Sequence, residues 1–287
     1  MSWTDWRRSA AWRKYILTHS GYIESTDASN ISPWCAFRGF TLSRALHDLM
    51  HVVHLGIAKD HIAQMLHDLC VFGFEGGGSL NDQLMRLYLK FKRWCRSHRI
   101  SYTRQRFTSK SLGIKSNQYP VMQRMKAAHA KPIIHFLAHR WRRVLTLPQA
   151  QHDAGLRLRA WACYGLAKLL HVFDRGSVFL TPDEIQRAQT ASQTFLLAWQ
   201  ELSFIAGSKG ETVFKLRPKG HYLAHLMIQV AETTENPRLL CNFIFEDFMG
   251  KIIMQARAQH RTNVTPRTVE LYVMHIRHRW RRGKKKS

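Results

Sequence analysis

Three short stretches of the sequence carry side chains of the kinds that bind metals or move protons. HDLMHVVHLGIAKD (residues 47–60) sets Asp48 and His51 among apolar residues. KGHYLAHL (219–226) places His221 and His225 four residues apart, and FEDFMGK (245–251) contains Glu246. A four-residue spacing puts two histidines on one face of a helix, which is a spacing used by zinc ligands. The three stretches are therefore the candidates for a chemical site.

In order, these stretches resemble motifs of the CACTA-type and KDZ-type DNA transposases. The first resembles their D-x-M-H-x-x-x-L-G-x-x-K segment, and Pro218 with KGHYLAHL resembles P-x-x-H-x-x-x-H-L. FEDFMGK resembles F-E-x-x-x-G. The motif histidines are His51, His221 and His225. Similar multi-copy proteins, relics of mobile elements, occur in some protist genomes.

The resemblance implies an RNase H-like core interrupted by an all-helical insertion, here at about 80–205. In such enzymes two aspartates and a glutamate hold two divalent metal ions, Mg²⁺ or Mn²⁺. Asp48 matches the second aspartate, and Glu246 matches the glutamate. Two ions held in this way activate the attacking oxygen and stabilise the leaving oxygen in phosphoryl transfer.

One part of the family pattern is missing. The first aspartate should lie on the first of three core strands, but only 47 residues precede Asp48. They include Asp5, Glu24 and Asp27, none of which lies in an alternating strand pattern. We therefore expect a truncated, mobile-element-derived copy that lacks one metal ligand and has lost the ancestral phosphoryl transferase activity.

Each candidate also has a purely structural interpretation. Asp48 is compatible with an ordinary surface position on a helix, since aspartates are usually exposed. His221 and His225 are compatible with a partly buried, hydrogen-bonded pair, and a zinc-dependent hydrolase is a distant alternative. Glu246 and Asp247 would suit the first turns of a helix, where negative charge is favourable.

Charge is the strongest compositional signal. The chain has 44 Lys and Arg against 19 Asp and Glu, a formal net charge of +25. Residues 83–152 contain no acid but sixteen Lys or Arg. This pattern favours nucleic acid, and DNA in particular, as a polyanionic partner over a small-molecule substrate. The alternative to a transposase relic is a non-enzymatic DNA- or RNA-binding module. The residues expected to contact nucleic acid are Lys90, Lys92, Arg93, Arg96, Arg104, Arg106, Arg140, Arg142, Arg143, Arg279, Arg281 and Arg282.

Four aromatic residues lie among these cations: Trp94, Tyr102, Phe107 and Trp141. They are candidates for stacking on exposed bases, but for each one a core position is the preferred interpretation. The surrounding residues 101–120 are rich in Ser, Thr, Lys and Gly and predict an exposed basic loop.

Periodicity predicts a mainly α-helical fold. Helices are expected over 49–69, 80–94, 121–145, 158–173 and 181–202, with a last one from Thr265-Pro266. A small remnant sheet is expected around 36–46 and in the apolar run 239–245. The expected organisation is a basic segment 1–35, one transposase-like domain 36–276 and a basic disordered tail 277–287.

The remaining composition excludes several classes of protein. Hydrophobic residues make up 45% of the chain, yet no long uncharged apolar run predicts a membrane span. The N-terminus lacks the apolar core of a signal peptide. Five scattered cysteines without a C-x-x-C pair are typical of a reduced compartment. We expect a nuclear protein, or otherwise a cytoplasmic one.

Overall fold

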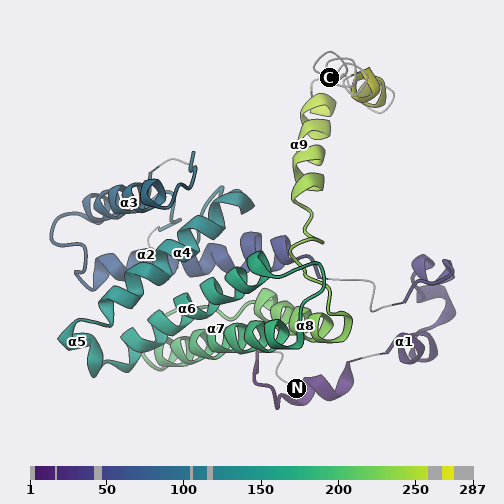
Figure 1. Ribbon diagram of the computed structural model, residues 1–287, viewed down its shortest axis with the longest axis horizontal. Coiled ribbons are helices and arrows are strands. Elements are labelled where there is room, and N and C mark those ends of the chain that lie inside the picture. The colour runs from purple at the N-terminus through teal and green to yellow at the C-terminus, as the bar shows by residue number, and fades with distance from the viewer. Residues whose placement is uncertain are drawn as a thin grey trace. The chain divides into compact units, whose positions relative to one another are not determined.

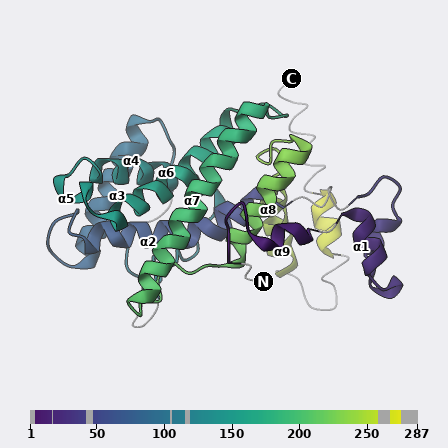
Figure 2. The ribbon, with the colours of Figure 1, turned by 90° about the horizontal axis from the view of Figure 1, so that it is seen from below.

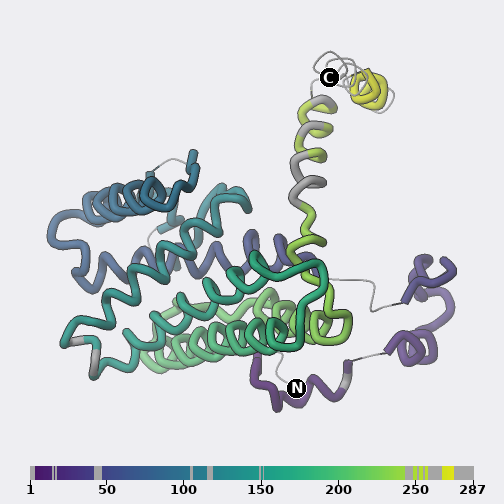
Figure 3. Tube along the Cα trace, viewed as in Figure 1, coloured from purple at the N-terminus to yellow at the C-terminus, as the bar shows by residue number. Residues whose placement is uncertain are grey.

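The computed structural model describes residues 4–16, 18–41, 47–103, 106–114, 119–257 and 267–274 (Figure 1). The chain forms two compact units, residues 1–240 and 241–287, and each is described by itself. The unit boundary falls inside the 36–276 domain expected from the sequence. Figure 3 follows the Cα trace through both units.

Helices account for the regular structure of the described residues, which confirms the mainly α-helical prediction. No described helix is long and apolar enough to cross a membrane. In chain order the elements are η1 (Ala11–Tyr15), α1 (His19–Ser25), η2 (Ala28–Asn30), η3 (Pro33–Ala36), the π-helix η5 (Met50–Ile57), α2 (Ala58–Val71), α3 (Leu80–Ser97), α4 (Ala127–Val144), α5 (Pro148–Gln151), α6 (Ala154–Arg175), α7 (Pro182–Ser208), α8 (Pro218–Thr233) and α9 (Phe243–Arg257).

The centre of the first unit is the pair α6 and α7, which lie side by side (Figure 2). Gly165 permits this close approach, since a β-carbon there would lie 2.7 Å from the carbonyl oxygen of Ala191. Helix α7 begins as the sequence predicts: the Thr181 side chain accepts a hydrogen bond from the Glu184 amide, and the Glu184 carboxylate accepts one from the Thr181 amide. Helix α4 covers α6, and α8 packs against both α7 and η5.

The segment before α4 is anchored rather than fully exposed, so the predicted exposed loop is wrong in part. Tyr102, Phe107 and Leu112 are buried. Tyr102 and Phe107 both pack on Phe91 of α3, with ring centroids 4.6 and 5.5 Å apart. Burial of their apolar area anchors the loop, although Ser101, Thr103 and Arg106 remain exposed. Residues 104–105 and 115–118 lie outside the described residues.

Helix α4 also begins later than the predicted residue 121. The backbone amides of Val121 and Gln123 donate to the carbonyls of Leu112 and Ser111. The amide of Met122 donates to the carbonyl of Lys59 at the start of α2. These bonds hold the backbone in a loop, and the helix starts only at Ala127.

The strand predicted over 239–245 is wrong. Leu239 and Leu240 lie in a turn whose amides donate to the carbonyls of Asn236 and Pro237, and α9 begins at Phe243. A short apolar run does not distinguish a strand from a helix by its pattern alone. The buried Asn236 side chain fixes the turn by donating to the carbonyl of Phe173 and accepting from the amide of Arg238. Of the other predicted strand, residues 36–41 form a 3₁₀ end and turns, and 42–46 lie outside the described residues.

In the second unit, α9 is followed by a short helix at 267–274. The rings of Phe248 and Tyr272 connect the two, with centroids 5.0 Å apart. The shorter helix follows the Thr265-Pro266 pair as the sequence predicts, although that pair itself is outside the description.

Candidate functional site

Asp48 lies at the entrance to η5, and its two carboxylate oxygens have different partners. Oδ1 accepts a hydrogen bond of 2.9 Å from the amide of Met50, and Oδ2 pairs with Nδ1 of His51. Its side chain is 13% exposed. An aspartate that binds the amides at a helix start satisfies donors that the helix leaves free. Asp48 therefore stabilises the start of η5, whether or not it also binds a metal.

The motif glycine is compatible with the unusual geometry of η5, in which a side chain at this position would clash. A β-carbon on Gly56 would lie 2.7 Å from the carbonyl oxygen of His51, five residues earlier, and 3.1 Å from the side chain of Lys219. A π-helix is rare and often marks a functional position. Here the missing side chain lets the first motif stretch contact the second.

The second motif stretch meets the first through its histidines as well. The His47 ring stacks on the His225 ring at 5.8 Å, and both Nδ1 and the backbone amide of His47 lie 3.1 Å from the side-chain oxygen of Gln229. Two of the three stretches that resemble transposase motifs are thus in direct contact.

His221 and His225 form a pair along α8, as their spacing predicts. Their Nε2 atoms lie 3.0 Å apart, the distance of a hydrogen bond between two imidazoles. Trp12 covers them, with its ring centroid 4.2 Å from His221 and 4.9 Å from His225. Burial, followed by the charges of His221 and His47, lowers the pKa of His225 to about 4. Both features fit the structural interpretation of the pair.

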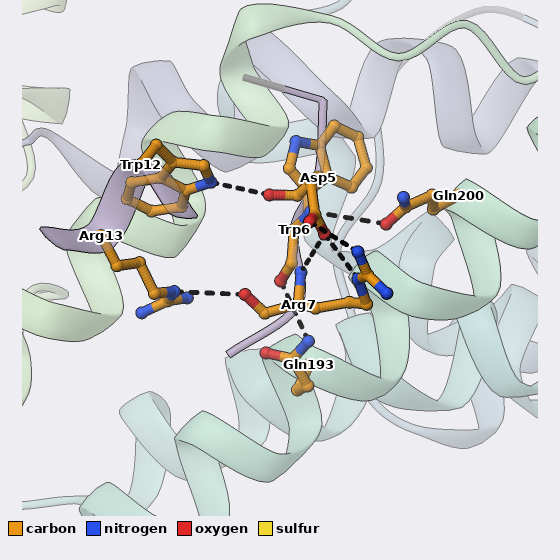
Figure 4. A network of polar contacts seen from close by, with 7 residues as sticks. All are labelled: Asp5, Trp6, Arg7, Trp12, Arg13, Gln193 and Gln200. Carbon is orange, nitrogen blue, oxygen red and sulfur yellow. Dashed lines mark hydrogen bonds and ion pairs between the residues drawn. The ribbon is translucent and has the colours of Figure 1, made fainter. Parts of the chain in front are cut away.

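The N-terminal segment that carries Trp12 is fixed to α7 by a polar network (Figure 4). Gln193 donates to the carbonyl of Trp6, the Trp6 amide donates to Gln200, and Trp12 Nε1 donates to the carbonyl of Asp5. These bonds place Trp6 over Gly220 of the second motif stretch.

Glu246, the other candidate metal ligand, lies on α9 in the second unit. Its side chain and that of Asp247 are outside the description. The separation of the Asp48 and Glu246 carboxylates therefore stays a prediction. Among the described residues, no group of three or more His, Cys, Asp or Glu side chains is arranged to hold a metal ion.

Two of the cations expected to bind nucleic acid have an internal partner. The Glu75 carboxylate is fully buried and receives Lys90 Nζ at 2.6 Å and Arg140 Nη2 at 2.5 Å. Lys92 also turns inward and donates to the carbonyl of Tyr102 at 3.1 Å. The sequence did not reveal these pairs, because Glu75 lies outside the acid-free stretch and 65 residues before Arg140.

Other expected contacts remain exposed. Arg93 and Arg96 lie on α3, and Arg142 and Arg143 lie in the last turn of α4; we call these four the α3–α4 surface. Phe91 of α3 packs on Phe136 of α4 at 5.2 Å. Arg106 is exposed in the following loop. Four of the predicted contact residues lie outside the described residues: Arg104, Arg279, Arg281 and Arg282.

The pKa of His139 on α4 is lowered in part by the positive charges around it. Burial comes first among the causes that lower the pKa of His139 on α4, followed by the charges of Arg143, Arg140, His98 and Arg142. His98 directly follows α3, so a group at the end of α3 acts on His139 together with the three arginines of α4. Helix C-termini carry partial negative charge, which favours basic side chains there.

The aromatic residues among these cations are mostly structural, as preferred from the sequence. Trp141, Phe107 and Tyr102 are buried, and Trp94 is half-buried. The Trp94 ring stacks on the ring of His98 at 4.4 Å and lies 6.0 Å from Phe136. Of the four, only Trp94 is partly exposed to solvent.

A second group of cations has no recognisable pattern in the sequence. Lys215 and Arg217 lie over the ring of Tyr119, at 4.1 and 5.3 Å from its centroid. Arg217 also pairs with Asp60 at 3.3 Å. Tyr119 and Asp60 are far from Lys215 and Arg217 in the sequence, and only the folded structure shows them as one cluster.

No protein-family model matches the chain, and comparison with curated proteins and with solved structures gave no match either.

Proposed function

We propose that this protein is a transposase-derived nucleic-acid-binding protein whose catalytic centre is incomplete. The observation that carries the binding proposal is the α3–α4 surface. Lys90 and Arg140 neutralise Glu75 inside the protein, whereas Arg93, Arg96, Arg142 and Arg143 are left exposed in a stretch without acids. Exposed arginines that lack nearby acids bind phosphates and release counterions.

The ancestry rests on the ordered motif resemblance. Contact of the first two motif stretches through Gly56, Lys219, His47 and His225 supports their reading as one functional region. The third stretch and the sheet of an RNase H-like core belong to the proposal through the resemblance alone. Asp48 and Glu246 are the metal ligands in this proposal, and Mg²⁺ or Mn²⁺ is the metal if the site is loaded.

Fluorescence anisotropy of a labelled 20-base-pair DNA duplex, titrated with protein over a range of KCl concentrations, tests binding. Replacing Arg142 and Arg143 by Gln removes two charges and keeps much of each side chain. The slope of log K against log[salt] should become shallower by about 2, roughly one per phosphate contact. A matched change of Arg175 and Arg187, exposed cations of α6 and α7, should leave the slope unchanged. An equal effect of both changes would contradict a localised contact.

Two further measurements address the catalytic centre. Nitroxide labels at positions 51 and 249, both in one variant without other reactive cysteines, report by pulsed dipolar spectroscopy whether the Asp48 and Glu246 regions are near each other. A separation above about 30 Å would exclude a shared pair of metals, whose ions lie only about 4 Å apart. We expect no DNA nicking by the purified chain in Mg²⁺ or Mn²⁺. Nicking that disappears in both Asp48→Ala and Glu246→Ala would show an active site and refute the proposed loss of catalysis.

A further inference from the structure

Four cations gather where α2 and α8 begin: Lys59, Lys215, Arg217 and Lys219, here called the α8 patch. Arg217 Nε lies 3.3 Å from the Asp60 carboxylate, and the charges of Lys59 and Lys215 act on the same carboxyl. Lys215, Arg217 and Lys219 line one small cavity together with Asp60. Lys215 and Arg217 are exposed, and Lys219 is half-buried.

The acid at this patch does not balance its cations. Asp60 is the one acidic residue that lines the cavity in the described structure, and it is only 8% exposed. Burial raises the pKa of Asp60 to about 6, although Arg217, Lys59 and Lys215 act in the opposite direction. Even when ionised it supplies a single negative charge against four positive ones. The patch differs in this respect from the buried Asp68, whose carboxylate is matched by Arg159 at 2.6 Å.

Packing holds the cations in place before any ligand arrives. The Tyr119 ring lies beneath both Lys215 and Arg217, and Trp199 Nε1 donates to the carbonyl of Lys215 at 3.3 Å. The stem of Lys219 contacts Gly56, while its ammonium lies 5.6 Å from the Tyr222 ring. Fixed side chains lose less conformational entropy on binding, so a charged ligand is bound more strongly.

We propose that the α8 patch binds the phosphodiester backbone of nucleic acid, as a contact separate from the α3–α4 surface. This inference rests on the proposed nucleic-acid binding and adds a second region to it. Lysines and arginines around an open surface contact successive phosphates and carry little sequence information. The N-terminus of α8, which begins at Pro218, adds the positive end of a helix dipole to the same place.

The experiment uses the full chain and a fluorescein-labelled 20-base-pair duplex of mixed sequence, with anisotropy measured from low to high KCl. The test variant replaces Lys215 and Arg217 by Gln, and the control is the Arg175 and Arg187 pair changed in the same way. We expect the salt slope to fall by about 2 in the test variant and to stay unchanged in the control. Lys59→Gln, on a different element, should lower it by about 1 and guards against a local folding defect at residues 215–217.

The outcomes separate this inference from the α3–α4 surface. A slope lowered by the Lys215 and Arg217 change but not by the Arg142 and Arg143 change supports the α8 patch and rejects the other surface. The reverse result overturns the α8 patch. Lower slopes in both variants, adding up in the quadruple variant, support both surfaces. A parent chain that binds no duplex at any salt concentration overturns both.

Discussion

Gly220 faces the indole of Trp6 so closely that a β-carbon at position 220 would lie 2.3 Å from the ring. Trp6 is 1% exposed and belongs to the N-terminal segment, whereas Gly220 lies in the first turn of α8. This contact joins two parts of the chain that are more than 200 residues apart. It gives the glycine of KGHYLAHL a physical reason: the indole occupies the space that a side chain would need.

Gly220→Ala should therefore displace Trp6 and loosen the N-terminal segment. Overpacking of this kind costs about 1–3 kcal/mol, to be measured as a lower free energy of unfolding in urea. Limited proteolysis should also cut before residue 16 sooner than in the parent. Gly207→Ala is the matched control, because a β-carbon at this helical position meets nothing within 4 Å. That change should be neutral or stabilising by up to about 1 kcal/mol.

Gly56→Ala should disrupt η5 and its contact with α8. The new methyl group would collide with the His51 carbonyl, which is backbone and cannot turn away, and with the Lys219 stem. We expect a loss of about 1–3 kcal/mol in the free energy of unfolding. An unchanged unfolding midpoint would show that η5 relaxes to an ordinary α-helix at no cost.

Glu75→Gln should be among the most destabilising single changes in the first unit. The change leaves the charges of Lys90 and Arg140 facing a neutral side chain at a buried position, and the loss of one partner from a buried ion pair costs about 3–5 kcal/mol. Asp183→Asn is the control, since Asp183 forms an exposed pair with Arg187 worth at most about 1 kcal/mol. Equal unfolding midpoints in urea for the two variants would contradict the buried-pair argument.

Stability should fall as the pH is lowered from about 6.5 toward 4. Burial lowers the pKa of His61 from 6.5 to about 3, and burial followed by the charge of Lys131 lowers that of His54 to about 4. The unfolded chain takes up these protons near pH 6.5 and the folded chain does not. The stabilising contribution is thus complete above pH 6.5 and is lost on acidification, by about 3 kcal/mol for His61 alone between pH 7 and 4.

His61→Phe tests this assignment. Neither ring nitrogen of His61 has a hydrogen-bond partner in the described structure, and the ring packs against Phe195 and Trp199. Phenylalanine therefore removes the proton-binding group without removing a bond, and urea unfolding between pH 7 and 4 should show a weaker dependence on pH. Asp60 has the opposite effect on the pH dependence. Because its pKa is raised, its contribution to the free energy of unfolding is lost as the pH rises from 3.8 to about 6. Asp60→Asn should consequently make the loss on acidification steeper.

The sequence by itself determined the helical class and several helix boundaries. The Thr181-Pro-Asp-Glu capping pattern specified the start of α7, because its hydrogen bonds are local. The spacing of His221 and His225 likewise specified their contact on α8. The strand prediction at 239–245 was wrong, because the turn fixed by Asn236 depends on carbonyls about 60 residues away in the sequence.

Only the tertiary structure decided which charges are available to a partner. Arg140 and Arg142 look alike in HRWRRV, but Arg140 faces the buried Glu75 and Arg142 faces solvent. Lys59 and Arg217 give no common signal in the sequence, yet both act on Asp60. The physical reason is that electrostatic energy depends on distance and burial in the folded chain. The charged residues can be read from the sequence, but the packing of the helices decides which of these charges are paired inside the protein.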